Sequence, residues 1–231
     1  MGLETKSENK ILAQGGLGIN FEPDLAAKDD FDFADLSAFG GPVFVLTIDT
    51  EEEFDWATPF ARSGFGTSHL KSIPRFQALC GEFSVKPCYL IDYPITQDPF
   101  GVELLAGYAN SGQAEVGVQL HPWVSPPFDE ILSPHNSYAC NLPEPLERAK
   151  LSTLHSVIVD RFGIHPDAYR AGRYGAGEHT ADILTDLGIS IDTSVRSRFN
   201  YAPQGGPDYR THPLDPYWLK RGQLLELPLT T

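Results

Sequence analysis

Five carboxylates lie within seven positions of one short segment, and they begin where an apolar run ends. The run ends at Ile48, and the acids that follow it are Asp49, Glu51, Glu52, Glu53 and Asp55. We expect Asp49 to be semi-buried at a strand end, where an unpaired charge needs a cation or strong hydrogen-bond donors. Asp49 and Glu51, two apart on an extended chain, can share a metal ion or divide acid and base roles. For Glu52 and Glu53 a solvated loop is the preferred interpretation. A structural role stays open for Asp49 and Glu51.

An amide and an imidazole form the second candidate group. Gln119 and His121 stand two apart on a predicted strand, so their side chains project to the same side. Proline and Trp123 follow and are expected to fix the histidine at a cleft wall, where an indole suits the face of a sugar. A lone histidine in the core or on the surface is the structural alternative.

The third candidate group surrounds a strand that ends in arginine. Arg170 can pair with a carboxylate of a neighbouring strand and hold it ionised as a base. The glycines that follow, around Arg173 and Tyr174, let backbone amides approach a ligand closely. Neither a dinucleotide fingerprint nor a phosphate loop is present. Asp192 ends the next strand, where it can orient the arginine or a histidine, or cap a helix.

These side chains depend on an alternation of buried strands and amphipathic helices. Such alternation predicts a parallel α/β sheet, whose functional groups gather at the carboxyl ends of the strands. Residues 1–41 are expected to form a loosely structured N-terminal arm with short packed stretches, and residues 42–231 a single domain. Strands are expected at 43–49, 88–91, 115–121, 168–171, 189–192 and 224–227, and helices at 68–83, 101–111, 145–162 and 178–187.

Composition narrows the range of partners. The 231 residues carry 31 acids against 17 bases, a formal charge of −14, which disfavours nucleic acid and anionic membranes. The three cysteines form no Cys-x-x-Cys pair, as is usual in a reducing compartment. We see no signal peptide and no apolar window long enough to span a membrane. We therefore expect a soluble, cytoplasmic protein.

The motifs, taken in order, resemble those of the NodB-type polysaccharide deacetylases, carbohydrate esterase family four, and most closely the WalW-type branch. The resemblance runs from about residue 42 to the end; each motif alone is weak, and the order of several is specific. The segments that carry it are Thr47–Glu51, Glu115–Gly117 with Gln119–Trp123, Asn136–Tyr138 with Asn141–Pro143, Tyr169–Gly175, Asp192–Ser194 and Leu224–Pro228.

The resemblance implies an irregular (β/α) barrel, incomplete at its C-terminus, and a hydrolase that removes N- or O-acetyl groups from a saccharide. It also implies that Asp49 is the base that activates water, that Arg170 tunes it, and that Asp192 occupies the fourth motif. A divalent metal such as zinc normally polarises the acyl carbonyl in this family. Gln119, Trp123, Arg173 and Tyr174 are the expected substrate-binding residues.

The sequence departs from the family pattern at the metal. Thr50 stands where the second aspartate is usual, and Gln119 and Trp123 stand where the two histidines are usual. Asp49, Glu51 and His121 would have to supply the ligands instead. No counterpart of the histidine that acts as general acid is visible.

Two other functions remain open. One is a metal-free carbohydrate-binding relative that keeps the cleft, with Trp123 and Tyr174 as stacking surfaces. The other is a glycosidase with a carboxylate pair such as Asp49 and Glu226, whose separation would decide between retaining and inverting chemistry.

Overall fold

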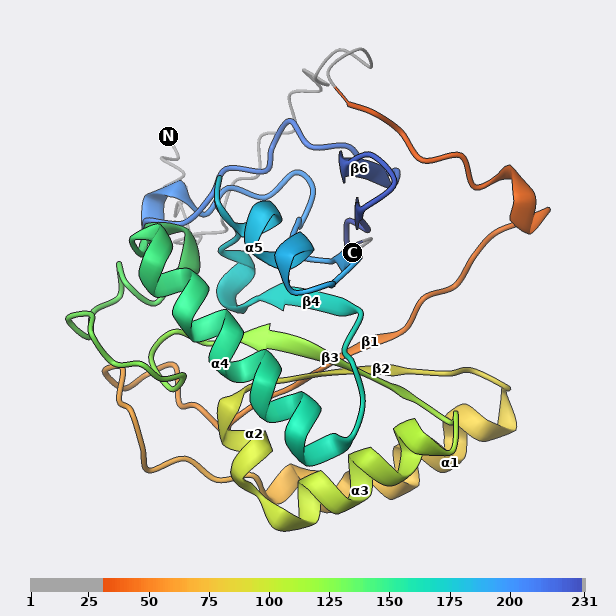
Figure 1. Ribbon diagram of the computed structural model, residues 1–231, viewed down its shortest axis with the longest axis horizontal. Helices are drawn as coiled ribbons and strands as arrows, with labels where there is room; N and C mark the ends of the chain where they lie inside the picture. The colour runs from red at the N-terminus through yellow and green to blue at the C-terminus, as the bar shows by residue number, and fades with distance from the viewer. Residues whose placement is uncertain (1–30, 230–231) are drawn as a thin grey trace, which may run out of the picture.

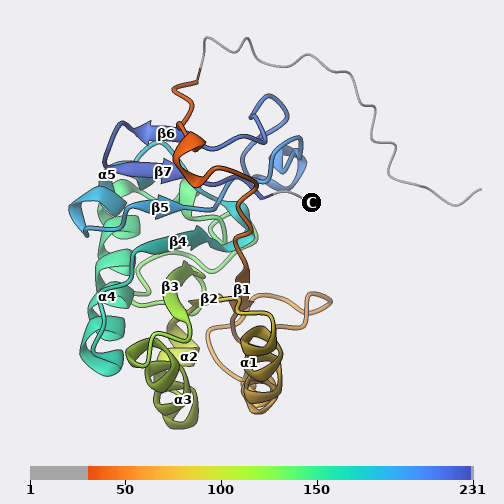
Figure 2. The same cartoon turned by 90° about the vertical axis from the view of Figure 1, so that its right-hand side faces the viewer.

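A curved, mostly parallel sheet of seven strands forms the centre of the described chain. The computed structural model describes residues 31–229. Their strand order is β1-β2-β3-β4-β5-β7-β6, and each neighbouring pair is parallel except β6 with β7 (Figure 2). The strands are β1 (Thr47–Thr50), β2 (Cys88–Ile91), β3 (Glu115–Leu120), β4 (Ala168–Ala171), β5 (Ile191–Asp192), β6 (Tyr217–Lys220) and β7 (Leu224–Glu226).

Helices cover the outer side of this sheet. Polar caps define their ends: the Asp98 carboxylate accepts from the Gly101 amide at 3.0 Å at the start of α3, and Gly163 ends α4 with φ +68°. The helices are α1 (Ile73–Glu82), α2 (Tyr93–Gln97), α3 (Pro99–Asn110), α4 (Glu144–Phe162) and α5 (Thr180–Asp186) (Figure 1). No helix within residues 31–229 is both long enough and apolar enough to cross a bilayer.

The core lies between the sheet and these helices. One face of α4 supplies Leu151, Leu154, Ile158 and Phe162, all buried against strand residues such as Tyr169. Burial of this kind is the main favourable term in folding. The open, mostly parallel α/β sheet agrees with the irregular (β/α) barrel predicted from sequence.

The predicted set of elements needs three corrections. The first strand begins at Thr47 and not at Val43, because β2 begins at Cys88 opposite Thr47, and Val43 and Phe44 are 47% and 74% exposed. The helix α2 was missed because five residues are too few to show a period; the Asp92 carboxylate caps it by accepting from the Ile95 amide at 3.2 Å.

The third correction is the antiparallel strand β6, which follows the Pro-rich residues 203–216 and forms a hairpin with β7. The last residues of the predicted arm contact β6. Phe33 forms an isolated bridge with Tyr217, and the Trp218 amide donates to the Asp32 carbonyl at 2.8 Å. Residues 1–30 of the predicted arm lie outside the described residues.

The loops that follow β1, β3, β4 and β5 leave the sheet at its carboxyl end, where the arrows of Figure 1 point. The predicted grouping of Asp49, His121, Arg170 and Asp192 at one end of the sheet is therefore confirmed, since each lies at or just beyond the end of a parallel strand.

Candidate active site

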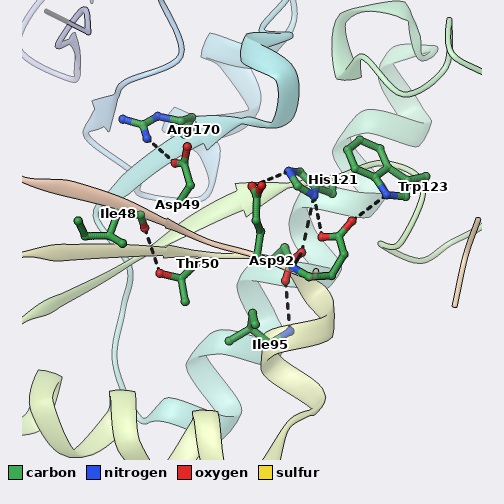
Figure 3. A network of polar contacts seen from close by, with 10 residues as sticks. Ile48, Asp49, Thr50, Asp92, Ile95, His121, Trp123 and Arg170 are labelled. Atoms are coloured by element: carbon green, nitrogen blue, oxygen red, sulfur yellow. Dashed lines mark hydrogen bonds and ion pairs between the residues drawn. The ribbon is translucent and has the colours of Figure 1, made fainter. Parts of the chain in front are cut away.

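An ion pair between β1 and β4, which β2 and β3 separate in the sheet, forms the first half of the site. Arg170 Nη1 of β4 donates to Asp49 Oδ1 of β1, and Arg170 Nη2 donates to Thr47 Oγ1 at 2.7 Å (Figure 3). The Asp49 side chain is 37% exposed, whereas that of Arg170 is 3% exposed. Asp49 is thus more open than the semi-buried position we expected, and the buried neighbour is Thr50, whose hydroxyl donates to the Ile48 carbonyl.

The arginine is fixed from behind by the strand next to it. Its Nε donates to Thr193 Oγ1 at 3.0 Å and to the Thr193 carbonyl at 3.2 Å. Asp192 is buried and accepts from the Ser194 amide at 2.9 Å and from its hydroxyl. Burial raises the pKa of Asp192 to about 6, against the hydrogen bonds from Ser194 and the charge of Arg170. Asp192 therefore anchors its own loop and does not contact Asp49.

A second, buried network surrounds His121. Its Nδ1 lies 2.8 Å from Glu52 Oε2, and its Nε2 lies 3.1 Å from Glu51 Oε2. Trp123 Nε1 donates to Glu52 Oε1 at 2.8 Å, and the Glu52 amide donates to Asp92 Oδ2 at 3.0 Å. Figure 3 draws this network apart from the pair of Asp49 and Arg170.

The charges in this network depend on one another. Burial alone lowers the pKa of His121, but the charge of Glu52 and hydrogen bonds to Glu51 and Glu52 raise it well above its usual range. Burial raises the pKa of Glu52, yet the His121 charge and hydrogen bonds win and lower it to about 2. Burial, with Glu52 as neighbour, raises the pKa of Asp92 well above its ordinary value. A protonated imidazole therefore bridges two carboxylates, and Asp92 keeps its proton.

A buried lysine of α4 holds the loop that carries this histidine. Lys150 Nζ donates to the carbonyls of Pro122, Ser125 and Pro127 at 3.0, 2.7 and 2.6 Å, and pairs with Glu130 at 2.9 Å. Burial lowers the pKa of this lysine, and Glu130 opposes the shift. Lys150 thus ties the Pro-rich loop after His121 to the helix behind it.

The predicted metal ligands do not form one group. Asp49 pairs with Arg170, whereas Glu51 contacts His121. The three residues whose donor atoms do lie within 4.8 Å of one another are Glu52, Asp92 and His121. Two carboxylates and an imidazole suit a divalent ion. The expectation of a solvated Glu52 was wrong, since this side chain is fully buried.

This buried group fits an ion by its chemistry. Neither Glu52 nor Asp92 has a lysine or arginine partner within the described residues, and Asp92 is neutral only because it keeps a proton. An ion could replace that proton and the one on His121. Because the three side chains are 0–3% exposed, such an ion would be closed off from a substrate.

Two of the four predicted substrate contacts are buried. Trp123 is 1% exposed and stacks on His121 with ring centroids 4.3 Å apart, so no face of its indole is free for a sugar. Gln119 is 3% exposed. The other two lie at the rim of the site: Arg173 and Tyr174 are partly exposed, and both have positive φ, +55° and +60°. Consecutive non-glycine residues in this region are strained, which is typical of functional loops.

The exposed aromatic residue near His121 is Trp56, which our sequence analysis did not select. It is 58% exposed, and its ring packs at 6.3 Å from Trp123 and 4.9 Å from Phe54. Arg173 lies 5.7 Å from the same ring. The only sequence signal was a tryptophan just after the acidic run, and its exposure depends on which aromatic neighbours fill the space below it.

Two hollows on the surface of the described residues lie away from this site. One of about 480 Å³ lies between α1 and α3, lined by residues that include Pro74, Gln77, Tyr108 and Gln113. Lys86 and Gln113 of its lining precede β2 and β3, so this hollow lies at the amino ends of the strands. The groups described above are therefore a rim of loops, not part of this hollow.

Solved structures with a similar fold come from several classes of enzyme. A protein of Mycobacterium smegmatis described as a polysaccharide deacetylase superposes with TM-score 0.50 and 22% identity over 71% of this chain. The PuuE allantoinase gives 0.50 and 12% over 81%, and a 4-alpha-glucanotransferase from Thermococcus litoralis gives 0.51 and 14% over 80%. This chain covers 49%, 60% and 27% of those three proteins, so it spans half or less of two of them.

No protein-family model matches the chain, and no curated protein matches it either. At these identities the likeness concerns the fold alone, and the three similar proteins differ in what their names describe. The chain therefore has the irregular, mostly parallel (β/α) fold that a deacetylase, an allantoinase and a glucanotransferase share.

Proposed function

We propose that this protein is a hydrolase that removes an N- or O-acyl group, such as acetyl, from a saccharide, with Asp49 as the base. The observation that carries the proposal is the pair of Asp49 and Arg170: a half-open carboxylate held by a buried arginine, each of whose three nitrogens donates a hydrogen bond, at the carboxyl end of a parallel sheet. The motif resemblance to WalW-type deacetylases and the deacetylase among the proteins of similar fold support the same class.

The arrangement suits general base catalysis. The outer oxygen of Asp49 is free to accept a proton from water as that water attacks the acyl carbon. Arg170 donates to the other oxygen of Asp49, and the bonds of Arg170 to Thr47 and Thr193 fix the direction of its guanidinium. The proton taken from water is the one that the departing sugar nitrogen or oxygen requires, so Asp49 can return it. The products are the free carboxylic acid and the deacylated sugar.

A divalent ion has a different place in this proposal. Glu52, Asp92 and His121 would hold it, rather than the set of Asp49, Glu51 and His121 expected from sequence. When bound at a catalytic centre of this kind, such an ion polarises a carbonyl and lowers the pKa of water. At the buried position it would instead tie the segment after β1 to the ends of β2 and β3.

A non-catalytic saccharide-binding protein is the second candidate. The observation that favours it is the loss of ligands at three positions: the Thr50 hydroxyl bonds its own strand, Gln119 is buried, and the Trp123 indole bonds Glu52. The glycosidase alternative lacks such support, because Glu226 is fully buried and accepts from the Val195 amide at 2.9 Å. A saccharide partner and a cytoplasmic location remain predictions.

Two products separate these functions. The purified protein is incubated with acetylated xylo-oligosaccharides and chito-oligosaccharides, and released acetate and new reducing ends are measured in the same samples. We expect acetate without reducing ends. Reducing ends without acetate would establish a glycosidase, and binding of the oligosaccharides with neither product would establish the binding protein.

A further inference from the structure

Two arginines at the rim of the site have no acidic partner. Five described arginines are at least partly buried, and three of them pair with carboxylates: Arg62 with Glu130, Arg148 with Asp186, and Arg170 with Asp49. The other two, Arg173 and Arg196, form no ion pair with any residue of 31–229. In a chain of charge −14, where acids are abundant, two such cations on the loops that follow β4 and β5 suggest a ligand that carries the missing charge.

The two arginines differ in how many hydrogen bonds their N–H groups form within the protein. Arg173 donates to Ser137 Oγ at 2.5 Å, to Gln204 Oε1 at 3.0 Å and to the Pro134 carbonyl, and its guanidinium lies 3.9 Å from the Tyr138 ring. These bonds join three loops, so Arg173 is largely a positioning residue. Arg196 has one long contact, from Nη1 to the Tyr201 hydroxyl at 3.4 Å.

Aromatic rings hold the Arg196 guanidinium in place. It lies 3.6 Å from the centroid of Phe199 and 5.7 Å from that of Tyr174. Its Nε is buried without a hydrogen-bond partner, and no bond joins its Nη2 to a residue of the described chain. A buried donor without a partner is costly, and ring faces attract the cation without satisfying its N–H groups. The guanidinium is therefore oriented but unsatisfied.

The backbone on both sides of Arg196 is also tied down. The Val195 amide donates to Glu226 Oε1 at 2.9 Å, and the Ser197 hydroxyl donates to the Pro213 carbonyl. Arg196 is thus fixed before any ligand arrives, which reduces the entropy lost on binding.

Tyr174 connects this arginine to the candidate base. Burial raises the pKa of Tyr174, the charge of Asp49 raises it further, and the charges of Arg170 and Arg196 lower it. Asp49, Arg170 and Arg196 therefore all lie within electrostatic range of one phenol. A ligand group bound at Arg196 would lie near the Tyr174 ring, which is 5.7 Å from the Arg196 guanidinium and belongs to the segment just after Arg170.

We propose that Arg196 binds a carboxylate of the saccharide, so that the substrate class is an acidic sugar chain of the uronic type. The planar guanidinium presents two terminal nitrogens, Nη1 and Nη2, whose N–H groups match the two oxygens of a carboxylate. Arg173 adds a second positive charge on the same rim. This inference deepens the proposed function and rests on it for the reaction, but the binding that it describes is measured without any reaction.

The test is a titration of the protein with tetragalacturonate and with its neutral methyl ester, followed by calorimetry. We expect the acid to bind at least about tenfold more tightly, as charged hydrogen bonds allow. Arg196→Gln should abolish the preference. Arg198→Gln is the matched control, since Arg198 is exposed on the same loop and its substitution removes the same charge. Equal binding of both ligands by the wild type, or equal loss in the two variants, would overturn the proposal.

A second variant keeps the test valid if Arg196→Gln unfolds. Arg196→Lys retains the charge but not the paired N–H groups, so its preference for the acid should fall below that of the wild type. An undiminished preference would overturn the assignment to the guanidinium. Preference for the acid without acyl release from any substrate would refute the catalytic proposal alone. Acyl release without that preference would refute this inference alone.

Discussion

Two acidic regions lie at the same end of the sheet and treat their charges in opposite ways. In the open region, one oxygen of Asp49 faces solvent and the other accepts from the buried Arg170, which also donates to Thr193. In the closed region, Glu52 and Asp92 are fully buried, and protons on His121 and Asp92 balance them. A carboxylate that reacts must reach its substrate, whereas a buried one that bonds several segments mainly stabilises them. The open region is therefore assigned the chemistry, and the closed region the structure.

The largest effect is expected on turnover. Asp49→Asn keeps the shape of the side chain but removes the proton acceptor, so acyl release should fall about 10²–10⁴-fold. The melting temperature should change little, because Asp49 is half open. Asp55→Asn, in the same acidic segment, serves as the control and should keep the wild-type rate. A rate for Asp49→Asn within a few-fold of wild type would make Asp49 structural.

The closed region should dominate stability. Glu52→Ala leaves the His121 imidazolium and the Trp123 N–H without their buried partner. Breaking a buried ionic network by removing one member costs about 3–5 kcal/mol of unfolding free energy. Urea denaturation measures this loss, and Glu53→Ala, at an exposed acid of the same segment, should lose much less. Equal losses in the two variants would contradict the division into open and closed regions.

A further buried carboxyl extends the comparison to pH. Glu147 of α4 accepts from Thr180 Oγ1 at 2.5 Å, and burial raises its pKa from 4.5 to about 7. A raised acid pKa means that the folded state binds the proton more tightly, so this contribution is present below pH 4.5 and is lost as pH rises through 7. Glu147→Gln should remove that part of the pH dependence, on the order of 3 kcal/mol. Denaturation curves across this range measure it; an unchanged slope would contradict the shift.

Metal binding should follow the closed region alone. An ion held by Glu52, Asp92 and His121 stabilises the folded state by about 2.7 kcal/mol at a hundred times its dissociation constant. Thermal denaturation with added Zn²⁺ or Mn²⁺ should show a rise in Tm for wild type and for Asp49→Asn, and none for Glu52→Gln. A rise that disappears in Asp49→Asn and survives in Glu52→Gln would place the ion in the open region.

The smallest effect is expected at Trp56, the exposed indole that we assign to stacking on the sugar. Because Trp123 is buried and Trp56 is exposed, Trp56→Ala should raise KM several-fold and change kcat little, since an aromatic contact contributes about 0.5–1.5 kcal/mol. Phe83→Ala, at an exposed aromatic at the end of α1, should leave KM unchanged. An unchanged KM in Trp56→Ala would exclude it as a substrate contact.

Much of the fold could be predicted because buried strands and long amphipathic helices leave a periodic pattern. The strands at 88–91 and 168–171 match the structure, and α4 begins one residue from the predicted start. The short helix α2 and the hairpin strand β6 left no such pattern. The family resemblance linked Arg170 to Asp49, whereas the strand pattern alone predicted a partner on a neighbouring strand; β2 and β3 in fact separate β1 from β4.

There is a physical reason why the closed region could not be predicted from the sequence. Glu51, Glu52 and Glu53 are identical in type and adjacent in sequence, yet they have different surroundings: one contacts His121 from the open side, one is buried beneath it, and one bonds Ser68 at the surface. The direction of the chain after β1 determines which of the three glutamates is buried. Asp92, which has no distinguishing feature in the sequence, determines the net charge of the buried network. Neither is encoded in local spacing.

The central claim is tested most directly by the rate of acetate release of Asp49→Asn and Glu52→Gln, measured side by side at a temperature where both are folded. We expect Asp49→Asn to be nearly inactive, while Glu52→Gln, though less stable, keeps a rate near that of the wild type. The opposite result, a lost rate in Glu52→Gln and a preserved one in Asp49→Asn, would move the chemistry to the buried network around His121 and contradict the account.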